Sequence, residues 1–179
     1  MRNFTIVVDM QYDFIYGPFG TKEAQEIVPA VVNTVAEAKS NGETVVLTQD
    51  THDENYLETQ EGKKLPVIHG IEGTEGWQII AEIDTTGCIL VKKNTFGYLG
   101  WRDIIGPDGE DVRIRLVGVC TGICVSSNAI ILKAMYPNAT IVVDPRACAC
   151  VTPESHRCAL ETMKSCQIEI AYPIEDFKP

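Results

Sequence analysis

The 179-residue sequence lacks both a long apolar segment and a basic cluster. Its longest apolar runs, such as 28–32 and 123–125, are far shorter than the roughly 20 residues that a membrane-spanning helix needs. No basic run exceeds the pairs Lys63-Lys64 and Lys92-Lys93, and 25 acidic against 15 basic residues give a formal net charge of −10. Binding to a phosphate backbone requires clustered positive charge. We therefore expect neither a membrane nor a nucleic acid as partner.

The sequence also lacks the features that are typical of a cleavable signal peptide and of a disulfide-rich protein. An acid interrupts the N-terminal apolar run early, and no small-residue cleavage site follows, so we expect no signal peptide. The seven cysteines are odd in number and most lie in or beside apolar segments, where a free cysteine behaves as a small hydrophobe. These features favour free thiols in a reducing cytoplasm.

The composition is that of one ordinary globular domain covering residues 1–179. Hydrophobic residues make up 45% and charged residues 22% of the chain, which excludes a disordered protein. Short apolar runs alternate with longer helical patterns. The predicted strands are 5–8, 44–48, 89–91, 114–119, 140–143 and 168–170, the predicted helices are 29–40, 77–83, 124–135 and 153–164, and 49–72 is predicted to be irregular.

The strands read as continuous apolar runs rather than alternating ones, which is typical of parallel strands buried on both faces. Helices between successive strands make right-handed crossovers. The sequence therefore predicts an α/β fold, a three-layer α/β/α sandwich with a mainly parallel sheet of about six strands. Ligands of such sheets bind beyond the carboxyl ends of the strands. Residues with useful chemistry leave four of these strands: Asp9, Asp50 with His52, Lys92 with Lys93, and the segment 120–124.

Cys124 is the strongest candidate nucleophile. It follows the strand and turn GVCTGIC and opens a predicted helix, where free backbone N–H groups and the helix dipole favour a thiolate and can hold an oxyanion. We interpret the other cysteines as packing residues. Cys148, Cys150, His156 and Cys158 do not have the spacing of a zinc finger or ribbon.

Asp9 ends an apolar strand, where a carboxylate is costly unless it has a partner. It could cap a turn, or act as general acid or base beside the thiol with a lysine as its partner. That lysine is Lys92 or Lys93, because neighbouring strand residues point to opposite faces and only one can reach the site.

A group of metal-ligand types lies in the irregular stretch. Asp50, His52 and His69 offer two imidazoles and a carboxylate, a good set for a divalent metal with open coordination positions, and Glu61 could add a fourth ligand. The metal that suits this set is Zn²⁺, with Fe²⁺ and Mn²⁺ as alternatives. Proton transfer by His52 and His69 without a metal is the other interpretation.

Taken together, these segments resemble the isochorismatase-like cysteine hydrolases, and among them the nicotinamidases. The resemblance covers nearly the whole chain and rests on residues 8–14 (VDMQYDF), 118–125 (GVCTGICV), 48–52 (TQDTH), 66–69 (PVIH) and 73–76 (GTEG). Lys93 is followed three residues later by Phe96 and Gly97, as the family's lysine is by an aromatic and a small residue, so the resemblance favours Lys93 over Lys92. Gly122 and Gly70 depart from the pattern, which often has an acid and a cysteine there.

The resemblance implies a metal-dependent nicotinamidase of NAD salvage, converting nicotinamide to nicotinate and ammonia through a cysteine thioester. It implies Asp9, Lys93 and Cys124 as catalytic residues, a cis peptide bond between Val119 and Cys120, and an oxyanion hole formed by the main chain of Cys120 and Cys124. The implied metal ligands are Asp50, His52 and His69, with Glu61 as a further possibility, and the implied ring-binding residues are Phe14, Phe96 and Tyr98.

Three other functions stay open at this point. The protein could hydrolyse another small amide, such as a carbamoyl or ureido compound. It could be a redox or zinc-storage protein that uses its seven cysteines, or a binding protein without catalysis. The partner we expect is a small-molecule amide, and a homo-oligomer remains open.

Overall fold

The computed structural model describes residues 1–177. One sheet of six strands organises this part of the chain, in the order β3-β2-β1-β4-β5-β6, and each strand pairs in parallel with its neighbours. The strands are β1 (Arg2–Val8), β2 (Thr44–Asp50), β3 (Ile89–Lys93), β4 (Val112–Val119), β5 (Thr140–Ala149) and β6 (Glu169–Ile170). The predicted parallel α/β class is confirmed.

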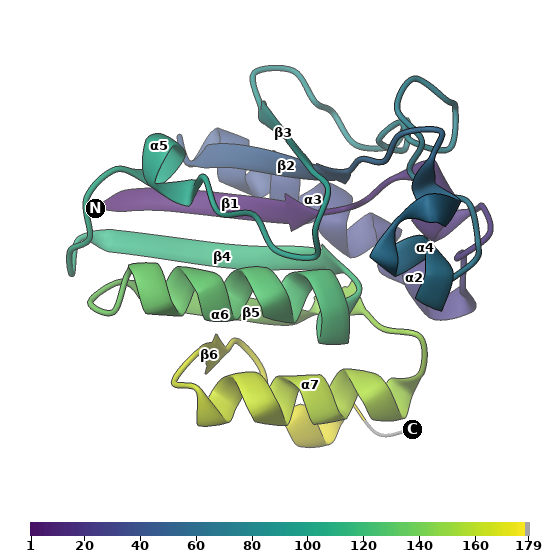
Figure 1. The fold of residues 1–179 in the computed structure, drawn as a ribbon. Helices are drawn as coiled ribbons and strands as arrows, with labels where there is room; N and C mark the ends of the chain where they lie inside the picture. The colour runs from purple at the N-terminus through teal and green to yellow at the C-terminus, as the bar shows by residue number, and fades with distance from the viewer. Residues whose placement is uncertain (178–179) are drawn as a thin grey trace.

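Helices cover both faces of the sheet, with α6 in front of it and α3 behind it in Figure 1. The helices are α1 (Tyr12–Ile15), α2 (Lys22–Glu26), α3 (Val28–Ser40), α4 (Gln60–Lys64), α5 (Trp101–Ile105), α6 (Ser126–Met135) and α7 (Pro153–Ser165). Short 3₁₀ turns lie at Tyr56–Glu58 and Ile174–Asp176, and a π turn at Thr121–Val125 leads into α6. None of these helices within residues 1–177 is long and apolar enough to cross a membrane.

The core consists of two apolar layers, one on each side of the sheet. Side chains alternate along a strand, so Ile6 and Val8 of β1 pack with α5, α6 and α7, whereas Val7 packs with α2 and α3. Both layers are fully buried at β1, which explains why this strand reads as a continuous apolar run.

The predicted helix at 77–83 is wrong. This segment consists of turns and a bridge in which Ile79 pairs antiparallel with Gln11. The backbone groups of Gln78 and Ile80 bond to Tyr12 and Met10 at 2.9 and 3.0 Å. These hydrogen bonds to the segment after β1 replace those that a helix would make within itself.

The stretch 49–72 is also more ordered than predicted, because it contains the Tyr56–Glu58 turn and α4. The Thr59 side chain caps α4 by accepting a hydrogen bond from the Gly62 backbone N–H at 3.0 Å. This capped helix carries Glu61 toward the end of β2. β5 runs six residues beyond the predicted end at Val143.

Candidate active site and metal centre

Three side chains from separate strand ends meet at the carboxyl edge of the sheet. Asp9 directly follows β1, Lys93 is the last residue of β3, and Cys124 lies in the π turn after β4. The Lys93 Nζ atom lies 2.7 Å from Asp9 Oδ2 and 3.7 Å from Cys124 Sγ. Asp9, Lys93 and Cys124 are all buried. A buried amine therefore touches both an acid and a thiol.

The structure places Lys93, and not Lys92, in this group. The side chain of Lys92 points to the opposite face of β3, is half exposed and pairs with Glu72 at the surface. Lys93 also contacts Asp50 Oδ1 at 3.1 Å. The buried ammonium of Lys93 thus lies between two buried carboxylates, and its positive charge favours the charged form of each.

Asp9 has a left-handed backbone, with φ of 49°. Thr48 of β2 donates a hydrogen bond from its hydroxyl to Asp9 Oδ1 at 2.6 Å, which orients the carboxyl group. Burial raises the pKa of Asp9 above its usual range, and the positive charge of Lys93 opposes this increase without cancelling it. Burial alone would lower the pKa of Lys93, but the negative charge of Asp9 raises it instead, so the amine stays protonated.

Cys124 rests as a neutral thiol. Burial and the negative charge of Asp9 raise its pKa well above the usual value, and the positive charge of Lys93 offsets this only in part. The predicted stabilisation of a thiolate by the start of the helix is thus outweighed by burial. A thiol in this state needs a base to remove its proton before it can attack. Asp9 is the adjacent acceptor.

The turn that carries Cys124 begins at a cis peptide bond between Val119 and Cys120, as the resemblance implies. Just before it, Gly118 has a φ of 114°, and a Cβ atom there would lie 2.2 Å from the backbone oxygen of Val8. Only glycine fits this close approach of β4 to the end of β1. The approach brings the turn with Cys120 and Cys124 beside Asp9.

A second group, next to the first, contains the four predicted metal ligands Asp50, His52, Glu61 and His69. Their ligand atoms all lie within 4.8 Å of one another. Asp50 Oδ2 is 3.0 Å from His52 Nε2 and 3.5 Å from His69 Nε2, and Glu61 Oε1 is 3.9 and 4.0 Å from the same two nitrogens. Burial would raise the pKa of Asp50, but the hydrogen bonds with His52 and His69 lower it below its usual range.

This donor set fits a zinc-type divalent cation. Two imidazole nitrogens and two carboxylates are ligands that such a cation prefers. The other ring nitrogen of His69, Nδ1, lies 2.7 Å from the backbone oxygen of Val67. A proton on Nδ1 satisfies that oxygen and leaves the lone pair of Nε2 directed toward Asp50 and Glu61.

Two residues that sequence reasoning did not assign to the site hold this cluster in place. Gln11 brackets Asp50, donating to its backbone oxygen at 2.9 Å and accepting from its backbone N–H at 2.7 Å. Asp13 accepts a hydrogen bond from the Gly70 backbone N–H at 2.9 Å, directly after His69. Gly70 has a φ of 59°, and a Cβ atom there would lie 2.9 Å from the Asp50 backbone oxygen. Gln11 and Asp13 both belong to the VDMQYDF segment, and their place in this segment was the sequence signal for their role.

Asn128 of α6 is a third residue missed by sequence reasoning. It is fully buried and accepts hydrogen bonds from the Tyr98 backbone N–H and the Trp101 indole at 2.9 and 3.2 Å. Its amide donates to the backbone oxygens of Phe96 and Cys124 at 3.1 and 2.8 Å. Asn128 therefore ties the loop after β3 to the turn that carries Cys124. A lone asparagine in an amphipathic helix gave no signal of this role.

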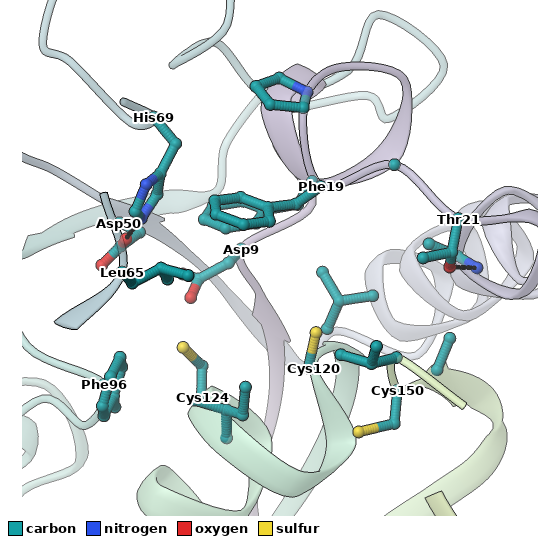
Figure 2. Close-up of a pocket in the computed structure, with 18 of the residues that line it drawn as sticks. Asp9, Phe19, Thr21, Asp50, Leu65, His69, Phe96, Cys120, Cys124 and Cys150 are labelled. Carbon is teal, nitrogen blue, oxygen red and sulfur yellow. Dashed lines mark hydrogen bonds and ion pairs between the residues drawn. The ribbon is translucent and has the colours of Figure 1, made fainter. Parts of the chain in front are cut away.

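Members of both groups line one cavity of about 380 Å³: Asp9 and Cys124 from the first, and Asp50, Glu61 and His69 from the second. Asp9 and Cys124 lie near its middle in Figure 2, with His69, Asp50 and Phe96 on one side and Cys120 and Cys150 on the other. The lining, which is mostly apolar, also includes Phe14 and Phe19.

Of the three predicted ring-binding residues, Phe14 and Phe96 line this cavity, but Tyr98 lies elsewhere. The Tyr98 ring packs edge to face against Trp101, with 5.1 Å between ring centroids. Its backbone N–H, held by Asn128, fixes it in the core beside α5. Phe19, whose ring lies 4.7 Å from that of His69, occupies the cavity wall instead.

Known structures with similar folds include amide-hydrolysing enzymes. A pyrazinamidase of Pyrococcus horikoshii, crystallised in complex with zinc, superimposes with a TM-score of 0.84 and 26% sequence identity, over 97% of this chain and 100% of that one. At lower identity the likeness concerns the fold alone. The N-carbamoylsarcosine amidase of Thermoplasma acidophilum has a TM-score of 0.74 and 22% identity, over 95% of each chain.

Sequence comparison leads to the same group of proteins. An isochorismatase family protein of Bacillus subtilis, PncA, described as uncharacterized, is 28% identical over 173 residues, covering 89% of this chain and 93% of that protein. The isochorismatase domain model matches residues 4–172, from β1 to just beyond β6. A match of this extent includes the six strands except the first two residues of β1, as well as every residue of the two polar groups, and the chain therefore belongs to the isochorismatase family of hydrolases.

Proposed function

We propose that this protein is a metal-dependent nicotinamidase, which hydrolyses nicotinamide to nicotinate and ammonia and thereby serves NAD salvage in the cytoplasm. The observation that carries the proposal is the contact of Lys93 with both Asp9 and Cys124. Directly beside it are the four candidate metal ligands, three of which line the same cavity as Asp9 and Cys124. The amide reaction uses the first group, and recognition of a pyridine ring uses the second.

In the proposed reaction Asp9 accepts the thiol proton of Cys124, and the resulting thiolate attacks the carboxamide carbon. Burial raises the pKa of Asp9, which makes its carboxylate a stronger base than an exposed one. Lys93 remains protonated, keeps Asp9 in place and stabilises the developing thiolate at 3.7 Å. The backbone N–H groups of Cys120 and Cys124 receive the negative charge on the substrate oxygen, a contribution typically worth about 10²–10³ in rate for each donor.

The tetrahedral adduct then collapses. Asp9 returns its proton to the leaving nitrogen, ammonia departs, and nicotinate remains bound to Cys124 as a thioester. A water molecule that gives a proton to Asp9 attacks the thioester carbon, and breaking of the C–S bond releases nicotinic acid, which ionises to nicotinate as its proton passes to ammonia or solvent. The thiolate of Cys124 takes the proton back from Asp9, which completes the cycle with one water consumed.

Asp50, His52, Glu61 and His69 would hold the divalent cation. The cation would supply a Lewis acid for a ring nitrogen of the substrate, which would help to orient the ring. The aromatic rings of Phe14, Phe19 and Phe96 give the ring its apolar walls.

The test is ammonia release from a panel of small amides: nicotinamide, pyrazinamide, and a carbamoyl and a ureido compound. We expect the pyridine and pyrazine carboxamides to be hydrolysed fastest, because both carry a ring nitrogen that could bind to the metal held by these four residues. Hydrolysis of the carbamoyl or ureido compound alone would contradict the proposed substrate and indicate another amidohydrolase of the same family.

A further inference from the structure

Three of the seven cysteines line the cavity, although the proposed reaction uses the thiol of only one. Besides Cys124, these are Cys120 and Cys150, which follow β4 and β5 directly. The last in-register pair of these strands joins Val119 to Ala149. Cys120 and Cys150 are each the next residue, and Figure 2 places both at the end of the cavity away from His69.

Val119 and Ala149 are partners on neighbouring strands, whose spacing of about 4.8 Å is within the roughly 4.4–6.8 Å between Cα atoms that a disulfide spans, and Cys120 and Cys150 directly follow this pair. Gly122 has no side chain that would crowd the sulfur atom of Cys150. A Cβ atom on Gly122 would lie 3.3 Å from Cys150 Sγ, and the glycine leaves that position open.

The two thiols differ in acidity. Interaction with the neighbouring Cys120 thiol, with further support from Ser155 and from the backbone of Gly122 and Val151, lowers the pKa of Cys150 to about 5. The same interaction, together with burial, raises the pKa of Cys120. At neutral pH the pair therefore consists of a thiolate at Cys150 and a thiol at Cys120, the arrangement that thiol oxidation requires.

We propose that Cys120 and Cys150 are a redox pair in the wall of the active site, which a hydroperoxide such as hydrogen peroxide converts to a reversible disulfide. The Cys150 thiolate attacks one peroxide oxygen, the O–O bond breaks, and the products are a sulfenic acid on Cys150 and hydroxide. The hydroxide takes up the proton that Cys150 had released and becomes the first water. The sulfur of Cys120 then attacks the sulfenic sulfur, and the departing oxygen leaves with the Cys120 proton as the second water. In sum, two thiols and one peroxide give one disulfide and two waters.

Cys150 is open to such a reagent on more than one side. Although only 5% of its surface is exposed, it borders the main cavity and two further hollows, one lined by Glu23, Arg146 and His156 and the other by Ser155 and Cys158. Cys124 is protonated at rest and reacts more slowly, because the thiolate is the species that peroxide oxidises.

The disulfide should reduce amide hydrolysis, and this part of the inference rests on the proposed function. The backbone N–H of Cys120 is a proposed oxyanion donor, and bonding its sulfur to Cys150 displaces the turn. Displacements of about 1 Å in an active site can cost 10²-fold in rate. We expect a loss of at least tenfold that a dithiol reductant reverses.

The test is to treat the metal-loaded protein with a small excess of hydrogen peroxide and then to block the remaining thiols with an alkylating agent. The intact mass is measured, and cross-linked peptides are identified after digestion with trypsin. We expect loss of two hydrogen atoms and a link between the peptides 116–133 and 147–157, located to Cys120 and Cys150 by fragmentation. Nicotinamide hydrolysis is followed in parallel, each sample being compared with its own untreated and reductant-treated aliquots.

The matched variants are Cys150→Ser, which should form no link and show no reductant-reversible loss, and Cys158→Ser, which should behave as the parent protein does. A link from Cys150 to Cys158, a link that involves Cys124, or no link at all would overturn the inference. A Cys120–Cys150 link without loss of hydrolysis would overturn its regulatory part. If untreated protein hydrolyses no amide, the proposed function fails, while the mass measurement still decides whether the pair forms.

Discussion

Replacing Lys93 with methionine tests the central ion pair, because the side chain keeps its length and loses its charge. Asp9 and Asp50, which are 1% and 3% exposed, would then face each other without a cation. Breaking a buried pair by removing one partner typically costs about 3–5 kcal/mol of stability. We expect a decrease of that size in the free energy of unfolding of the metal-free protein, together with loss of amide hydrolysis.

The deficit should depend on pH. The positive charge of Lys93 holds down the pKa of Asp9, so its removal raises that pKa further above the unfolded value. The folded variant then binds more protons than the unfolded chain, and its stability decreases as pH rises through the raised pKa. Lys93→Met should therefore be closest to the parent protein in mild acid and furthest from it at neutral and higher pH.

Urea unfolding of the metal-free proteins at several pH values measures this effect, and Lys92→Met is the matched control. Lys92 pairs with Glu72 at the surface, where such a contact contributes about 0–1 kcal/mol, so its loss should change little at any pH. Equal stability of the two variants, or a deficit of Lys93→Met that does not change with pH, would refute the description of Lys93 as the buried partner of two carboxylates.

Three other substitutions separate the parts of the site. Cys124→Ala should abolish amide hydrolysis and leave bound metal, measured by elemental analysis, as in the parent protein; residual turnover would rule out Cys124 as the nucleophile. His52→Ala should lower metal content and raise KM for nicotinamide, and unchanged values of both would show that the cluster binds no functional metal. Asp13→Ala removes the acceptor that holds Gly70 beside His69, so metal affinity from a titration should decrease about 10–100-fold, as for other residues that orient metal ligands. Unchanged affinity would assign Asp13 to folding alone.

The parallel sheet could be predicted because burial on both faces leaves a direct mark on the sequence. Most residues of β1 and β4 are buried and apolar, among them Ile6, Val7 and Val8 of β1 and Leu116, Val117 and Val119 of β4. Since parallel strands end at one edge, the convergence of Asp9, Asp50 and Cys124 also follows from the order of strands and helices.

The alternation of side chains along a strand could not decide between Lys92 and Lys93. It predicts that the two side chains point to opposite faces of the sheet, but not which of them points into the site. β3 lies at the edge of the sheet, and Ile89 and Leu90 are both largely exposed, so apolar residues do not mark its inner face. Only the following residues, through the family resemblance, favoured Lys93.

The errors arise where tertiary contacts override a local pattern. Residues 77–83 have apolar residues at helical spacing, but their backbone groups pair with the segment after β1, far away in the sequence. The family resemblance implies Tyr98 as a ring-binding residue, yet Asn128 accepts a hydrogen bond from its backbone N–H, and its ring packs against Trp101 instead of lining the cavity. Neither contact can be predicted from the sequence of one of the two contacting segments alone.

The most direct test of the proposed function is the rate of ammonia release from nicotinamide by the purified protein, before chelation, after chelation and after zinc, iron or manganese is added back. We expect turnover that is lost with the metal and restored by at least one of the three, because the proposed ligands Asp50, His52, Glu61 and His69 would hold the metal that positions the ring for Cys124. Metal-loaded protein that releases no ammonia from nicotinamide, or releases it equally well after complete chelation, would contradict that claim.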